Sequence, residues 1–109
     1  MSVETDITIN KWKSKEEFKE RVLHFARIIG VEIKSLYFRP MANKWASCST
    51  NGNLNFNPEL LALDKEIGDY VIVHELLHSK TPNHGKLWKS LMRVHLGNYE
   101  IVKDRLLAT

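Results

Sequence analysis

The stretch DYVIVHELLH, residues 69–78, decides the fold of this chain. Apart from His74 and Glu75, its second to ninth residues are apolar. Such a run, inside a segment that can continue as a helix from about 65 to 79, predicts a largely buried α-helix. His74 and His78 are four residues apart, so their side chains lie on the same face of that helix.

Two imidazoles one turn apart can hold a single Zn²⁺ at about 2.0–2.1 Å. Glu75 lies about a hundred degrees further round the helix, where its carboxylate can take a proton from water without binding the metal. The alternative is that both histidines are core residues bonded to backbone atoms. Burying two imidazoles and a carboxylate without strong partners is costly, whereas one metal ion satisfies all three. The sequence therefore predicts one Zn²⁺ held by His74 and His78, with Glu75 as the catalytic residue of a hydrolase.

A catalytic zinc has three protein ligands and one open position for water. His84 is the best candidate for the third ligand, because Thr81-Pro82-Asn83 ends the helix and can turn the chain back over the metal. Two alternatives remain open at this point. Glu100 follows at a thermolysin-like distance, and Cys48 could reach the ion as a thiolate from the hairpin described next.

The strand-like segments lie between residues 31 and 57. Val31–Arg39 alternates apolar and polar positions, which is typical of a strand. Two further runs, 44–49 and 54–57, flank Asn51-Gly52. Asn-Gly is the strongest short hairpin signal, because both central residues of a type I′ turn need positive φ. We expect a three-stranded, mostly antiparallel sheet with an exposed edge, and therefore an α+β fold.

Helix start and stop signals surround these strands. Ser14-Lys15-Glu16-Glu17 has the spacing of a capping box and opens an amphipathic helix that Gly30 can end. Further starts are expected at Pro58 with Asn57 as its cap, at Lys65 with Asp64 as its cap, at His84 with Asn83 as its cap and Gly97 at its end, and across Tyr99–Leu107.

The composition is that of an ordinary globular protein. A length of 109 residues predicts one domain, 1–109, with 43% hydrophobic and 27% charged residues. No apolar run is long enough to span a membrane, and the first residues lack the apolar centre of a signal peptide. Cys48 is the only cysteine, in keeping with a reducing compartment, so we expect a cytoplasmic location. The net charge of +3 is modest and favours a solvated surface over a nucleic-acid-binding one.

Four ordered motifs resemble one known family. They are Lys44-Trp45-Ala46-Ser47-Cys48-Ser49, Gly52-Asn53-Leu54-Asn55-Phe56-Asn57, the stretch 69–78, and Asn83-His84 followed by Leu87-Trp88. They resemble the YgjP-like metal-dependent hydrolases, and the chain is similar in size and order of elements to the minigluzincins. Ala46 and Phe56 stand where that family commonly has Gly and Trp.

The resemblance implies a minimal zincin fold. In such a fold an N-terminal helix and a three-stranded sheet pack on the HExxH helix, and further helices follow. It also implies a zinc-dependent metallopeptidase with His74, His78 and His84 as metal ligands and Glu75 as general base. The name gluzincin implies a glutamate as third ligand, which keeps Glu100 as an alternative.

The expected partner is a peptide or protein substrate. The exposed strand offers substrate-binding candidates at Lys44, Trp45, Ala46 and Ser47, since an extended peptide can add to a sheet edge. Tyr99 and His95, with Tyr70 as a third option, are candidate stabilisers of the oxyanion. The segment Tyr99–Thr109 can lie across the cleft and keep the enzyme latent as a zymogen.

Rival functions start from the same metal ligands. A peptide deformylase would use Cys48, but the other motifs of that family are absent. A metal-dependent endoribonuclease of the YbeY type shares the interval between the last two histidines, although Glu75 argues against it. A metal-stabilised binding module without catalysis is the third alternative. The sequence does not specify an oligomeric state.

Overall fold

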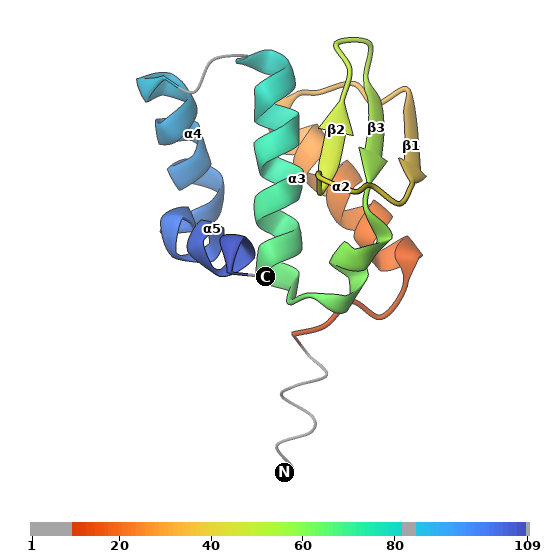
Figure 1. The fold of residues 1–109 in the computed structure, drawn as a ribbon. Coiled ribbons are helices and arrows are strands. Elements are labelled where there is room, and N and C mark those ends of the chain that lie inside the picture. The colour runs from red at the N-terminus through yellow and green to blue at the C-terminus, as the bar shows by residue number, and fades with distance from the viewer. Residues whose placement is uncertain (1–9, 82–84, 109) are drawn as a thin grey trace.

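The computed structural model describes residues 10–81 and 85–108. Its elements in chain order are α2 (Lys15–Ile29), β1 (Ser35–Phe38), β2 (Ala46–Cys48), β3 (Asn53–Phe56), the 3-10 helix η1 (Pro58–Ala62), α3 (Lys65–Lys80), α4 (Lys86–Leu96) and α5 (Tyr99–Leu107). Figure 1 shows α3 in the middle of the molecule, with the sheet and α2 on one side and α4 and α5 on the other. This order of a helix, three strands and further helices is the predicted α+β architecture.

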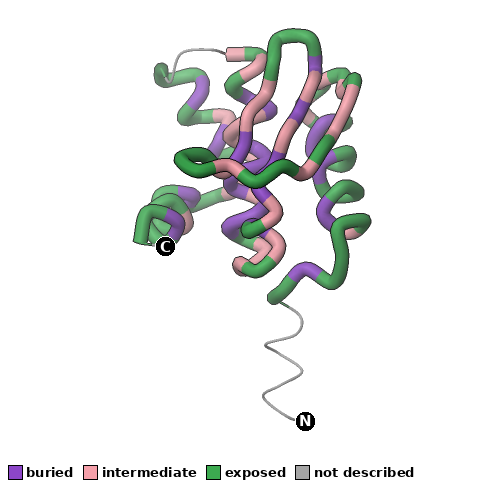
Figure 2. The backbone as a smooth tube through the Cα atoms, turned by 45° about the vertical axis from the view of Figure 1, so that its right-hand side comes forward, coloured by how far each residue is buried: buried purple, intermediate pink, exposed green. Residues whose placement is uncertain are grey.

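The core forms around α3 because this helix is apolar on nearly all of its faces. Ile72, Val73 and Leu76 are fully buried in it. Phe18 of α2 joins the helix layer to the sheet, since its ring packs against that of Phe56 with centroids 5.1 Å apart. Figure 2 shows the buried residues gathered between the layers and the exposed ones outside them. A helix held on several sides is a rigid support for the side chains that it carries toward solvent.

The sheet is mixed, which differs from the mostly antiparallel sheet expected from the sequence. Its strand order is β1-β3-β2. The β2–β3 hairpin is antiparallel as predicted, but β1 pairs with β3 in parallel. After β1 the chain crosses to the far edge of the sheet before the hairpin begins. β2 therefore runs antiparallel to β1, and β3, which turns back from β2, runs parallel to β1. The central strand is therefore β3, and β2 is left as the edge strand nearer to α3.

The hairpin turn also differs from the predicted type I′ turn. Gly52 has φ of 86°, but Asn51 does not have positive φ. The Gly52 amide donates to the carbonyl of Ser49 at 3.1 Å, and the Ser49 amide donates to Asn53 at 3.0 Å. This is a three-residue loop in which a tight turn is followed by a left-handed glycine, the second most common hairpin solution. The Asn-Gly signal located the hairpin correctly but identified the wrong turn.

Only one of the two hydrogen bonds of the predicted capping box of α2 is present. The Ser14 hydroxyl accepts from the Glu17 amide at 3.2 Å. The Glu17 carboxylate, however, accepts from the amide of Lys13 at 2.8 Å and not from that of Ser14. This hydrogen bond lowers the pKa of Glu17. At the other end Gly30 adopts the left-handed conformation expected of a helix stop, with φ of 84°.

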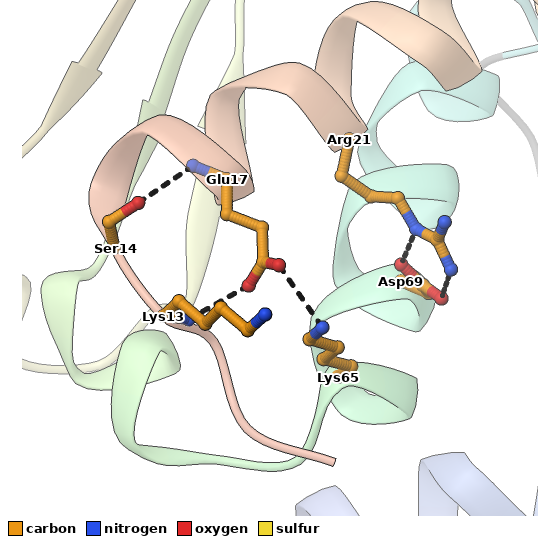
Figure 3. Close-up of polar contacts among 6 residues, drawn as sticks. All are labelled: Lys13, Ser14, Glu17, Arg21, Lys65 and Asp69. Atoms are coloured by element: carbon orange, nitrogen blue, oxygen red, sulfur yellow. Dashed lines mark hydrogen bonds and ion pairs between the residues drawn. The ribbon is translucent and has the colours of Figure 1, made fainter. Parts of the chain in front are cut away.

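Two ion pairs join α2 to α3, as Figure 3 shows. Arg21 donates to both oxygens of Asp69, at 2.7 and 2.8 Å. Lys65 lies 3.2 Å from the Glu17 carboxylate. A bidentate guanidinium–carboxylate pair fixes orientation as well as distance, so the first half of α3 has a defined rotation relative to α2.

The boundaries of the later elements agree closely with the prediction. Asn57 caps η1 by accepting from the Glu59 amide at 3.1 Å. Asp64 is at the N-cap position of α3, but its side chain makes no capping hydrogen bond. The predicted cap at Asn83 lies outside the described residues, and α4 begins after Gly85. No helix within residues 10–81 and 85–108 has both the length and the apolar character that crossing a membrane requires.

We expect Gly68→Ala to destabilise the fold, although alanine normally stabilises a helix interior. A Cβ at Gly68 would lie 2.6 Å from Cζ2 of Trp12, a buried ring that packs against this face of α3. Overpacking costs about 1–3 kcal/mol, which outweighs the gain of about 0.8–1.0 kcal/mol in helix propensity. The measurement is urea unfolding, with an expected net loss of up to about 2 kcal/mol. In a Trp12→Leu background the same substitution should instead stabilise; a loss there as well would contradict this explanation.

Candidate active site

A cavity of about 500 Å³ opens between α3 and the edge of the sheet. Its walls come from the loop before β2, from β2 itself, from one face of α3 and from α5. The residues that line it are Asn43, Lys44, Trp45, Ala46, Ser47, Cys48, Tyr70, Val71, His74, Glu75, His78 and Leu106. The cavity therefore brings together the histidines and the glutamate that the sequence singled out, along with the predicted substrate-binding strand.

The two histidines of α3 face this cavity one above the other. Their ring centroids are 6.1 Å apart and their planes differ by 25°. The ring of His74 is held from the side by Trp88 of α4, edge to face at 5.2 Å, and by Tyr70 at 5.7 Å. His78 is more exposed. One imidazole is thus fixed by packing, whereas the other lies at the open side of the cavity.

Glu75 lies beside the histidines and is mostly removed from water. Its carboxylate is 4.0 Å from Nδ1 of His74, and its side chain is 16% exposed. Burial raises the pKa of Glu75, while the nearby His78 and Lys44 act in the opposite direction. A desolvated carboxylate with a raised pKa is a better proton acceptor than one in water, as general-base catalysis requires.

The donor set fits a divalent metal such as Zn²⁺. Two imidazoles on one helix face share a cavity with a carboxylate, and neutral imidazole is a preferred zinc ligand. Within the described ranges 10–81 and 85–108, no group of three His, Cys, Asp or Glu is arranged to hold an ion. The predicted third ligand, His84, lies outside the described residues.

The two alternative third ligands are placed differently. Glu100 forms an ion pair with Arg93 at 2.9 Å, and its side chain is 61% exposed. It does not line the cavity. Cys48 does line it, and its thiol pKa is raised by burial and by the charge of Glu75. Of the two alternatives, only Cys48 therefore lies beside the histidine pair.

The candidate oxyanion stabilisers also separate. Tyr99 is buried and stacks on Tyr70, with ring centroids 6.3 Å apart. His95 lines a different cavity, between α2 and the start of α5. Neither is among the residues that line the cavity described above, whereas Tyr70 is. Tyr70 lies four residues before His74 on the same face of α3, and burial raises the pKa of its hydroxyl, which keeps it protonated.

β2 is an edge strand of the sheet. Trp45 is hydrogen-bonded to Asn57 and Ser49 to Asn53, and in an antiparallel pair such positions alternate with positions that point away. The intervening residues Ala46 and Cys48 therefore direct their N–H and C=O groups away from β3. Both residues line the cavity.

Sequence reasoning did not identify several residues of this cavity. Asn43, Val71 and Leu106 line it, and none belongs to a recognisable catalytic pattern. Val71 could have been found, because it follows Tyr70 on a helix already predicted to carry the site. Leu106 is 35 residues after Val71 in the chain, and its position beside the cavity depends on how α5 packs on α3.

The chain was compared with known proteins. A model of the family described as YgjP-like, metallopeptidase domain, matches residues 7–109. Among solved structures, the metallopeptidase zymogen abylysin of Pyrococcus abyssi is similar with a TM-score of 0.73 and 22% identity, covering 84% of this chain and 92% of that one. The metallopeptidase zymogen jannalysin of Methanocaldococcus jannaschii has the same TM-score, 24% identity, and coverage of 84% and 94%. At these identities the two structures show a shared fold. No curated protein matches.

Proposed function

The chain belongs to the YgjP-like metallopeptidase family, and we propose that it hydrolyses peptide bonds at a single Zn²⁺, with His74, His78 and His84 as ligands and Glu75 as general base. The observation that carries this proposal is the shared cavity: His74, Glu75 and His78 all line it, and the carboxylate is shielded from water beside the imidazoles. We also propose that residues 1–109 form one catalytic domain. The single cysteine supports a cytoplasmic location.

The chemistry divides between the ion and the side chains. A bound Zn²⁺ would supply Lewis acidity and lower the pKa of water toward about 7. Glu75 takes the proton from the attacking water on a carboxylate oxygen and then gives it to the leaving amine. Tyr70 is our candidate for donating a hydrogen bond to the negative charge that develops on the substrate oxygen, because its ring lies in the cavity wall.

An extended peptide can bind along the free edge of β2. The backbone groups of Ala46 and Cys48 that point away from β3 are available to pair with it, as in other cases of strand addition. Lys44, Trp45 and Ser47 would then contact substrate side chains. The edge lies across the cavity from Glu75, so a peptide held there passes the base.

The proposal is tested with protein loaded with one equivalent of Zn²⁺ and a set of unstructured fluorogenic peptides. We expect cleavage that a chelator abolishes and that added Zn²⁺ restores. A single-stranded RNA and a structured RNA are assayed in parallel. Cleavage of RNA but not of peptide would favour the endoribonuclease alternative, and zinc binding with neither activity would favour a binding module.

We further propose that the C-terminal helix keeps the cleft partly closed. Leu106 of α5 lines the cavity. The neighbouring Arg105 holds the helix against the start of α3, through Asp64 at 2.6 Å and Glu66 at 2.9 Å. Because these ion pairs are at the surface, each contributes only about 0.2–1 kcal/mol. A closure of this strength is reversible, which suits a latent enzyme.

We expect Arg105→Gln to raise peptide cleavage by about two- to tenfold, because losing both ion pairs weakens the hold on the end of α5, which the buried Leu106 still anchors. The measurement is kcat/KM with the same fluorogenic peptides. The matched control is Arg93→Gln, which removes the ion pair to Glu100 at the other end of α5 and should leave the rate unchanged. Equal rates for Arg105→Gln and the unmodified protein, at equal Tm, would contradict latency of this kind.

A further inference from the structure

Lys44 gives the entrance of the cavity a positive charge that the proposed chemistry does not use. Among the described residues that line the cavity, Lys44 is the only lysine or arginine, and Glu75 is the only carboxylate. In the described part of the chain no ion pair to Lys44 is found, although it is close enough to Glu75 to act on it electrostatically. The ammonium is therefore exposed, positive and directed to the same space as the base.

The backbone of Lys44 is fixed by a buried amide. Asn57 is 3% exposed, and its side-chain nitrogen donates to the carbonyl of Lys44 at 3.2 Å and to that of Met41 at 3.0 Å. The Asn57 backbone amide donates to Trp45 at 2.9 Å. Both amide protons of a buried side chain are thus used to hold residues 41–45. Because the loop backbone is already ordered, binding of a ligand to the charge has to order only the Lys44 side chain.

Apart from the proposed Zn²⁺, the described lining has no second lysine or arginine. The opposite wall, from Tyr70, Val71 and Leu106, offers carbon surface and a tyrosine. A carboxylate placed near Glu75 would be repelled by it, whereas one placed at the entrance beside Lys44 would be attracted. Away from the metal position, the two side-chain charges therefore favour a negatively charged group at the Lys44 end only.

We propose that Lys44 forms a subsite that selects peptides carrying a carboxylate next to the cleaved bond. This inference rests on the proposed peptidase function and adds a substrate class to it. The carboxylate has two sources, an acidic side chain or the free C-terminus of a peptide. Both present the same group to the ammonium, and a substrate series can separate them.

The test uses full-length protein loaded with Zn²⁺ and one neutral peptide frame. A single Glu is moved along the frame and compared at each position with Gln, always with an amidated C-terminus. A second arm compares free and amidated C-termini in peptides without Glu. At one position, or in the free C-terminus arm, we expect kcat/KM to be about two- to fivefold higher for the carboxylate, as for a partly exposed ion pair.

Lys44→Gln should bring that ratio close to one, and Lys44→Glu should invert it, so that a Lys-containing peptide is preferred. Lys19→Gln, an exposed lysine of α2 outside the cavity, is the matched control and should keep the ratio of the unmodified protein. Cleavage with a ratio near one in every position and in both arms would overturn the subsite while leaving the peptidase proposal intact. Retention of the full carboxylate preference by Lys44→Gln would also overturn the subsite.

Binding provides a readout that does not require turnover. Fluorescence anisotropy with labelled peptides and zinc-loaded Glu75→Gln protein should give a Kd about two- to fivefold lower for the preferred carboxylate peptide, and the difference should vanish when Lys44→Gln is added. If the unmodified protein cleaves no peptide, this measurement still decides between selective binding and none, and equal Kd values would overturn the subsite.

Discussion

Glu75→Gln is expected to abolish peptide hydrolysis while leaving one Zn²⁺ bound. The amide has the size of the carboxylate but cannot accept a proton, and general-base catalysis contributes about 10²–10⁴-fold to rate. Because Glu75 is not a proposed ligand, zinc stoichiometry should stay at one. The measurements are kcat on the best fluorogenic peptide and metal content after removal of free zinc.

The same isosteric change at Glu20, an exposed residue of α2, serves as control and should leave kcat unchanged. A Tm for Glu75→Gln equal to or above that of the unmodified protein is expected, since burial raises the pKa of this carboxyl and so disfavours its charged form. Undiminished cleavage by Glu75→Gln would show that Glu75 is not the general base.

His78→Ala is expected to lose the metal without losing the fold. His78 is the more exposed of the two histidines of α3, so its removal leaves no cavity in the core. Changes in the groups that merely orient metal ligands cost about 10–100-fold in affinity, and removal of a ligand itself should cost at least about 100-fold. Zinc titration by calorimetry measures this directly, and hydrolysis should disappear at stoichiometric zinc.

The control is His24→Ala, which removes an exposed imidazole from α2 and should bind zinc as the unmodified protein does. Thermal unfolding adds a second criterion, because a metal that binds only the folded state raises Tm. Zinc should raise the Tm of the unmodified protein and of His24→Ala, and not that of His78→Ala. If His78→Ala takes up one zinc with unchanged affinity, the proposed ligand pair is wrong, whatever the peptide assays give.

The helices could be predicted closely from the sequence because their signals are local. The cap at Ser14, the stop at Gly30 and the breaks around α5 depend on neighbouring residues, and the structure places these boundaries within a residue or two. Apolar residues on nearly every face of α3 likewise predicted that it is largely buried. In the site, the histidine pair and Glu75 were found because one helix turn brings them together.

What the sequence did not give were relations between distant segments. The parallel pairing of β1 with β3 depends on the path of the chain between the strands. The Asn51-Gly52 pair does not specify how many residues the hairpin loop contains. Leu106 reaches the cavity through the packing of α5 on α3. Asn57 holds residues 41–45 beside the cavity through the hydrogen bonds of its side-chain amide. Neither has a spacing that links it to the HExxH motif.

The two walls of the cleft are held in different ways. Residues 41–48 are connected to the central strand by the β2–β3 pairing and to Asn57 by side-chain hydrogen bonds, so displacing this wall would break several hydrogen bonds at once. The wall formed by α5 follows Gly97, where φ is 67° and an added Cβ would meet no atom within 4 Å. We therefore expect a bulky substrate to be accommodated by displacement of α5, with the strand wall as the fixed reference along which the peptide is aligned.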